Sequence, residues 1–121
     1  MSEHYSPVRK LAATDHVDAF DCGQVALNQF LQRHALVNQK ANSAQTYVCC
    51  HANAVVGFYS LAVGSVAPQA APERVMKGLA RHPVPVMILA RLAVDSAHQG
   101  KGLDQALLRD ALLRTAQAAD I

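Results

Sequence analysis

The residues best suited to chemistry form a short turn in the last third of the chain, Gln99-Gly100-Lys101-Gly102, between an apolar run and a helical pattern. The first amide groups of a helix have no partner within the helix, and the helix dipole favours negative charge there. Glycines in such a turn let an anion approach the backbone closely. The turn therefore predicts an anion site, and a diphosphate is its natural occupant.

Two common phosphate-binding motifs do not match this turn. A P-loop has Gly, four residues and then Gly-Lys-Ser/Thr, whereas Lys101 lies between two glycines. A dinucleotide fingerprint needs a third glycine or alanine where Gln105 stands, and it opens the first βαβ unit of a chain. Both motifs are excluded. A turn whose glycines only shape the passage from strand to helix stays as the alternative.

The remaining chemically active side chains give weaker signals. Cys22, Cys49 and Cys50 show no C-x-x-C spacing and no histidines at metal-like intervals, so we expect inert thiols and no metal site. Adjacent cysteines cannot form an ordinary disulfide, which indicates a reducing compartment. His98, beside the glycine turn, is interpreted as a solvated loop residue. We find no signal peptide and no apolar run of about 20 residues, so we expect a cytoplasmic protein without a membrane segment.

Bulk properties limit the protein to a single domain over residues 1–121. The chain has 121 residues, of which 51% are hydrophobic, and no repeat or linker divides it. Its formal net charge of +2 argues neither for nor against a polyanionic partner. The substrate has to be inferred from the site.

The elements that position the turn are predicted from hydrophobic periodicity. Asp21, with Gln24 three residues later, favours a helix N-cap, and apolar residues then recur at helical spacing up to Lys40. A second helix is expected over 73–79, begun by Pro72, and a third over 103–119. Four residues mark its inward stripe, which Leu108 and Leu112 broaden: Leu103, Leu107, Ala111 and Ala118.

Strand-like runs occupy most of the sequence between these helices. Their composition favours strands over 45–50, 55–63 and 84–94, with a possible edge strand over 8–12. Asn53 predicts a hairpin turn between the first two. The run 84–94 is the longest apolar one, and its composition suits a central strand covered on both faces. Helices on a mostly antiparallel sheet make the predicted fold class α+β (α/β layered).

The turn also resembles the motif of a known superfamily. Gln99-x-x-Gly102-x-Asp104 is similar to the Gln/Arg-x-x-Gly-x-Gly/Ala motif of the GNAT N-acetyltransferases. Further phrases resemble one branch, the GNAT toxins of bacterial toxin–antitoxin pairs, and the likeness covers nearly the whole chain. They are DCG (21–23), VVGFYSL (55–61), PER (72–74), RHPVPV (81–86) and LARLAVD (89–95).

The resemblance implies acetyl-CoA as the acetyl donor. In the family, backbone groups of the strand before the turn hold pantetheine and polarise the thioester carbonyl, and amides of the turn cradle the pyrophosphate. The implied cofactor residues are Leu92, Ala93, Val94, Gln99, Gly100, Lys101, Gly102, Leu103 and Asp104.

The resemblance also implies a substrate and partners. Toxins of this branch acetylate the amino acid carried by aminoacyl-tRNA, which blocks translation, and a ribbon-helix-helix antitoxin neutralises them. Lys77, Arg81 and Arg91 could form a basic face for the tRNA backbone. Ordinary solvated surface charge is the alternative for these three residues.

Two features depart from the family pattern. The family has Gly or Ala at the position of Asp104, whose carboxylate would lie near a bound diphosphate. The family's general acid is commonly a tyrosine on a later helix. None of Tyr5, Tyr47 and Tyr59 matches that position, so this tyrosine would lie beyond Ile121.

In the family, the fold continues after the helix over 103–119 with further strands and a helix. Without them, we expect an exposed apolar sheet edge and helix face, covered by a second copy in a homodimer or by a partner. The leading hypothesis is an acetyl-CoA-dependent N-acetyltransferase of the toxin type. The alternatives are a catalytically degenerate toxin that dimerises or binds an antitoxin, and a small-molecule amine acetyltransferase.

Overall fold

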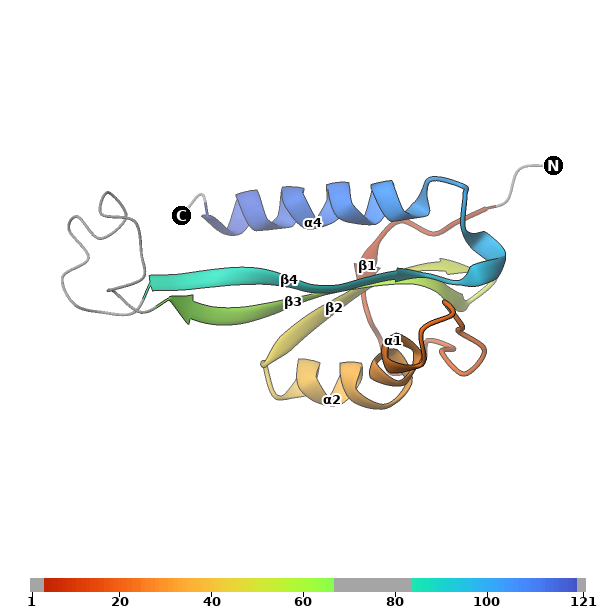
Figure 1. Cartoon of the computed structure of the whole chain (residues 1–121), viewed down its shortest axis with the longest axis horizontal. Helices are drawn as coiled ribbons and strands as arrows, with labels where there is room; N and C mark the ends of the chain where they lie inside the picture. Colours follow the sequence, from red (N-terminus) through yellow and green to blue (C-terminus); the bar gives the residue numbers. More distant parts are fainter. Residues whose placement is uncertain (1–3, 67–83, 120–121) are drawn as a thin grey trace.

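The computed structural model describes residues 4–66 and 84–119 and places a four-stranded sheet between two helical layers (Figure 1). The strand order is β1-β2-β3-β4, and every neighbouring pair is antiparallel. This is an α+β fold, as predicted. The strands are β1 Arg9–Lys10, β2 Ala44–His51, β3 Ala54–Val66 and β4 Val84–Val94.

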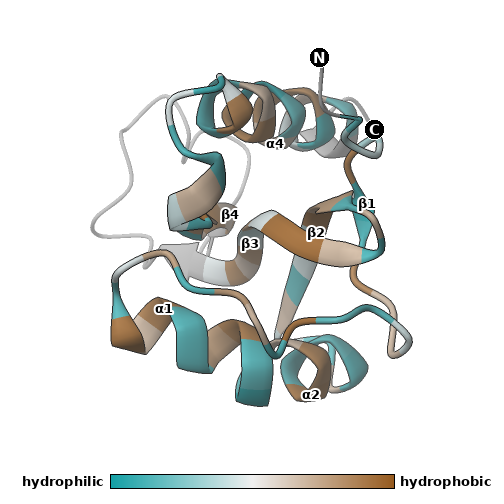
Figure 2. Cartoon of the chain, turned by 90° about the vertical axis from the view of Figure 1, so that its right-hand side faces the viewer, coloured by the Kyte–Doolittle hydropathy of each residue, from teal (hydrophilic) through white to brown (hydrophobic). Residues whose placement is uncertain are grey.

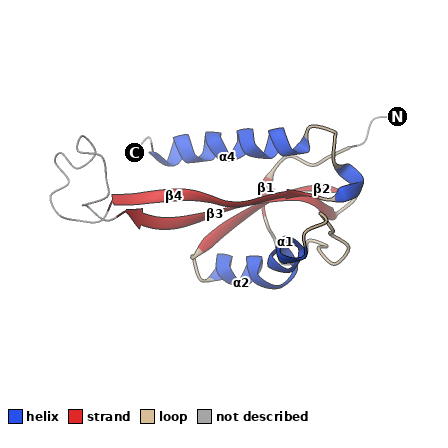
Figure 3. Cartoon of the chain, in the orientation of Figure 1, coloured by secondary structure: helices blue, strands red, loops and turns tan. Residues whose placement is uncertain are grey.

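The helices lie on opposite faces of the sheet, as Figure 3 shows. On one face, α1, a π-helical segment and α2 follow one another without a break. On the other face lies α4, which a short 3-10 helix precedes. Their bounds are α1 Val25–Gln29, the π-helix Phe30–His34, α2 Ala35–Lys40, the 3-10 helix Ser96–His98 and α4 Leu103–Ala119. The predicted helix over 73–79 falls outside the described residues.

The predicted cap at Asp21 is wrong. Helix α1 begins at Val25, and its N-cap residue, Gln24, makes no side-chain cap bond. Asp21 instead closes the loop before the helix: its carboxylate accepts hydrogen bonds from the Gly23 amide at 2.9 Å and from Asn28 Nδ2 at 3.0 Å. Gly23 adopts a φ of +88°, which favours glycine, so the chain turns once more before it becomes helical.

The hairpin between β2 and β3 matches the prediction. Ala52 and Asn53 form its turn with φ values of 51° and 71°, the left-handed pair that a two-residue hairpin turn needs. The register sets Tyr47 opposite Tyr59, with their rings stacked 5.1 Å apart.

Each face of the sheet has its own apolar core. The end-on view in Figure 2 shows α4 on one side of the sheet and α1 and α2 on the other. Toward α1 and α2, the ring of Phe58 lies 5.5 Å from that of Phe20 and 6.1 Å from that of Phe30. Toward α4, Tyr59 and Leu107 are fully buried. Side chains of both helical layers thus pack against the sheet near the start of α4.

Strand β4 spans its predicted residues, but the interior position expected from its composition is wrong. It is the edge strand of the described sheet, and Met87, Ile88 and Leu89 are 41–47% exposed. The exposed apolar sheet edge that we expected from the family resemblance is present.

Helix α4 also spans its predicted residues, but its buried stripe is narrower than expected. Leu103, Leu107 and Ala111 are buried, whereas Leu108 and Leu112 are 43% and 63% exposed, because only one line of the helix surface meets the sheet. In the described part of the chain, we find no helix that could cross a membrane.

Candidate cofactor site

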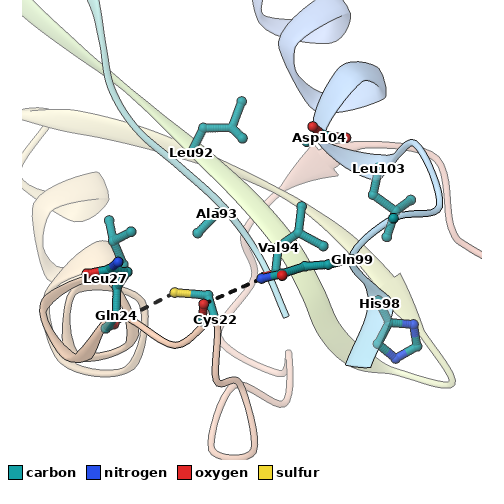
Figure 4. Close-up of a pocket in the computed structure, with 11 residues that line it drawn as sticks. Cys22, Gln24, Leu27, Leu92, Ala93, Val94, His98, Gln99, Leu103 and Asp104 are labelled. Atoms are coloured by element: carbon teal, nitrogen blue, oxygen red, sulfur yellow. Dashed lines mark hydrogen bonds between the residues drawn. The ribbon is translucent and has the colours of Figure 1, made fainter. Parts of the chain in front are cut away.

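A cavity of about 360 Å³ lies between the loop that precedes α1 and the turn that follows β4 (Figure 4). Its lining mixes polar and apolar residues and includes the first turn of α4. Eleven residues line it: Cys22, Gln24, Leu27, Leu92, Ala93, Val94, His98, Gln99, Gly100, Leu103 and Asp104.

The end of β4 forms one wall of the cavity. Leu92 and Val94 belong to the core under α4, and Ala93 belongs to the opposite core, because neighbouring side chains of a strand point to opposite faces. The last rung of the β3–β4 ladder pairs Gly57 with Val94. A Cβ atom at Gly57 would lie 3.0 Å from Leu107 Cδ1, so the glycine lets α4 pack close to the sheet here.

The turn after β4 forms the rim. Asp95 Oδ1 accepts the Ala97 amide at 2.9 Å and starts the 3-10 helix. Gly100 and Gly102 have φ values of +79° and +84°, and a Cβ atom at either would meet nothing within 4 Å. The backbone conformation therefore favours glycine at both positions. Because neither glycine has a side chain, that side of the turn is open to a ligand.

The loop before α1 forms the other wall and is fastened to the turn. Asp95 Oδ2 accepts the Asp21 amide at 3.0 Å, and the Ser96 amide donates to the Asp21 carbonyl at 2.8 Å. The Gly23 amide and Asn28 hold the pKa of the Asp21 carboxyl below its usual range. From the sequence, this loop was expected to cap a helix and to match the family phrase DCG, and its role as a wall was not predicted.

The structure brings most of the predicted cofactor residues together. Seven of the nine line the cavity, and the exceptions are Lys101 and Gly102. Both are exposed on the turn, and Gly102 borders a shallower hollow beside Arg109. Four lining residues were not predicted as cofactor residues: Cys22, Gln24, Leu27 and His98.

His98 is not the solvated loop residue that we expected. It is half-buried, its Nδ1 lies 2.9 Å from the Tyr5 hydroxyl, and its ring centroid lies 5.4 Å from that of His51. These contacts come from residues far apart in the sequence, so local patterning gave no signal of them.

The predicted basic face is described only in part. Lys77 and Arg81 lie outside the described residues. The Arg91 guanidinium stacks over the Phe30 ring, with Cζ 3.9 Å from the ring centroid, on the α1 side of the sheet. Stacking fixes the cation while leaving N–H donors for an anion.

Of the three cysteines and three tyrosines, Cys22 is the one that lines the cavity. Burial raises the pKa of the Cys49 and Cys50 thiols, as expected for inert cysteines. Burial and the neighbouring carboxylate of Asp110 raise the pKa of Tyr59 as well, which opposes its ionisation. Within residues 4–66 and 84–119, no three His, Cys, Asp or Glu side chains are grouped to hold a metal ion.

Comparison with known proteins identifies the family. No family model matches the chain. It is 46% identical over 116 residues to the tRNA-acetylating toxin of Mycobacterium tuberculosis, and the match covers 96% of this chain and 69% of that protein. The chain belongs to the tRNA-acetylating toxins.

Solved structures of GNAT toxins agree with this assignment. The toxin fold superposes on AtaT in complex with acetyl-methionyl-tRNAfMet with a TM-score of 0.79 and 28% identity, covering 96% of this chain and 71% of AtaT. A variant of AtaT bound to the C-terminus of the antitoxin AtaR and acetyl-CoA gives a TM-score of 0.76 and 26% identity. That match covers 95% of this chain and 68% of the other. The chain thus spans about seven tenths of the length of these relatives.

Proposed function

We propose that this tRNA-acetylating toxin binds acetyl-CoA in the cavity between the loop before α1 and the turn after β4, and that it transfers the acetyl group to the amino group of aminoacyl-tRNA. The observation that carries the proposal is the placement of seven predicted cofactor residues around one cavity beside a helix N-terminus. AtaT, a relative of the same fold, has been solved with acetyl-CoA and with an acetylated aminoacyl-tRNA.

The residues present fit this cofactor. The open side of the turn at Gly100 and Gly102, followed by the first amides of α4, suits a diphosphate. Leu92, Ala93 and Val94 offer backbone groups and apolar surface to a pantetheine chain. Acetyl-CoA supplies an activated acetyl group as a thioester. The chain's own residues bind the cofactor, orient its carbonyl and exclude water from the apolar wall.

For the tRNA, we propose Arg91, together with Lys77 and Arg81, as phosphate contacts. The stacked guanidinium of Arg91 supports this role, because its orientation is fixed before the nucleic acid arrives. The apolar strand edge at Met87, Ile88 and Leu89 supports a protein partner, either a second copy in a homodimer or a ribbon-helix-helix antitoxin. Sedimentation as a monodisperse monomer would oppose the homodimer.

We also propose that residues 1–121 act as a single domain in the cytoplasm. One sheet joins both cores, which supports a single domain. Three free cysteines, two of them buried and adjacent in the sequence, are consistent with a reducing compartment.

A catalytically degenerate toxin that binds without turnover is the second candidate. The position of Asp104 at the cavity rim favours it, because a carboxylate there opposes a diphosphate. Calorimetric titration with acetyl-CoA, followed by an acetyl-transfer assay on charged tRNA, separates the two functions. Binding with transfer supports the enzyme, binding without transfer supports the degenerate toxin, and no binding contradicts both the cofactor site and the enzyme.

A further inference from the structure

The side chain of Gln99 reaches toward two backbone carbonyls. Its Nε2 donates to the Val94 carbonyl at 2.9 Å and makes a longer contact of 3.5 Å with the Cys22 carbonyl. A carboxamide nitrogen carries two hydrogens, so it can serve two acceptors at once. Figure 4 shows Gln99 extended from the turn toward Cys22, along the edge of the cavity.

These two acceptors belong to different walls of the cavity. Val94 ends β4, and Cys22 lies in the loop before α1, 77 positions from Gln99. The loop before α1 is also joined to the turn after β4, by the bonds from the Asp21 amide to Asp95 and from the Ser96 amide to Asp21. We refer to these bonds, together with those of Gln99, as the wall clamp.

Regular structure ends in both walls next to the wall clamp. The ladder of β4 ends at Val94, and the loop at Cys22 precedes the first turn of α1. The clamp therefore joins the two sides of the cavity where the ladder stops and before the helix begins. From within the glycine turn, the Gln99 side chain bonds to both walls.

We propose that the Gln99 side chain is a positioning group that sets the cavity for acetyl-CoA without contacting the cofactor itself. The proposal rests on the proposed function, because it concerns the same cavity. It also gives a physical reason why the motif accepts Gln or Arg at this position: both present N–H donors on a long side chain, and the task needs donors and no acceptor.

The test uses two variants at this position and one control. Gln99→Met keeps the length and the neutral charge but removes the donors, and Gln99→Arg restores donors. The control is Gln117→Met, the same change on an exposed residue about 21 Å along α4 from its first residue. Each protein is titrated with acetyl-CoA by calorimetry, and amide hydrogen exchange is followed in the free protein.

We expect Gln99→Met to raise the Kd for acetyl-CoA about tenfold, equivalent to about 1.4 kcal/mol. In the free protein, it should also speed exchange of the Asp21 and Ser96 amides, which belong to the clamp. Gln99→Arg should bind within about threefold of the unmodified chain and restore slow exchange. The Gln117→Met control should match the unmodified chain in both readouts.

Three results would overturn the proposal: unchanged binding in Gln99→Met, no rescue by Gln99→Arg, or weakened binding with unchanged exchange. The last would indicate that Gln99 contacts the cofactor directly. If the unmodified chain does not bind acetyl-CoA, the proposed function fails. The exchange measurement then still decides whether Gln99 holds the two walls together.

Discussion

The hydroxyl of Tyr59 donates a 2.6 Å hydrogen bond to Asp110 Oδ2, which ties the middle of the sheet to the middle of α4. The same oxygen accepts Nε of Arg114 at 2.7 Å, and the guanidinium of Arg114 lies over the Tyr47 ring. A buried phenol, a carboxylate and a cation thus dock the helix whose first turn borders the candidate cofactor site.

Removing this hydroxyl should weaken the docking of α4. Tyr59→Phe leaves the Asp110 carboxylate with one partner fewer, and we expect the free energy of unfolding to fall by about 2 kcal/mol. Urea denaturation measures the change. Tyr47→Phe is the matched control, because it keeps the ring between Tyr59 and Arg114, and it should cost less than about 0.5 kcal/mol. Equal losses in the two variants would contradict the assigned role.

The protein should lose stability in alkali. The pKa values of Tyr59, Cys49 and Cys50 are raised in the folded state, so the folded chain holds protons that the unfolded chain releases. Their contribution is fully present below the unfolded pKa values, about 8.5 for a thiol and about 10 for a phenol, and it is lost progressively as the pH rises from there through the higher folded pKa values.

Denaturation at a series of pH values, under reducing conditions, tests this. The free energy of unfolding should decline from about pH 9 upward. In Tyr59→Phe, the decline above about pH 10 should be shallower. An unchanged slope in that variant would show that Tyr59 does not titrate differently in the two states.

Gly102 should be needed for its backbone conformation. At a φ of +84°, alanine is strained by about 1 kcal/mol, whereas asparagine tolerates this region better. We expect Gly102→Ala to lower both stability and acetyl-CoA affinity and Gly102→Asn to lower them less. Calorimetry and urea denaturation give the two quantities. Affinity in Gly102→Ala equal to that of the unmodified chain would mean that the turn does not bind the diphosphate.

Asp104 should stabilise the free protein and weaken its binding of acetyl-CoA. A carboxylate in the first turn of α4 interacts favourably with the helix dipole, which stabilises the folded protein by about 0.3–1 kcal/mol. Asp104→Asn should lower the free energy of unfolding by this amount. The same change removes a negative charge beside the anion site and should tighten acetyl-CoA binding about threefold at low salt, with a smaller gain at high salt. Weaker binding in Asp104→Asn would contradict the placement of the diphosphate.

The regular elements near the site could be predicted from the sequence because their signals are local. Val84–Val94 and Leu103–Ala119 were predicted with the observed bounds, since apolar runs and helical spacing are read over consecutive residues. The glycine turn was also located, because positive φ values select Gly100 and Gly102.

Features that depend on distant contacts were missed. The carboxylate of Asp21 has several amide donors within reach, and sequence alone does not show that Gly23 is among them. The burial of His98 depends on Tyr5, 93 positions away. The exposure of Leu108 and Leu112 depends on how much of α4 the sheet covers.

Binding of acetyl-CoA between the end of β4 and the start of α4 can be measured directly by amide chemical shifts in solution, as acetyl-CoA is added to the protein. We expect the largest shifts on Leu92 to Val94 and on Gln99 to Asp104, with smaller ones at Cys22. Shifts confined to other parts of the chain, or none at saturating acetyl-CoA, would contradict this binding site.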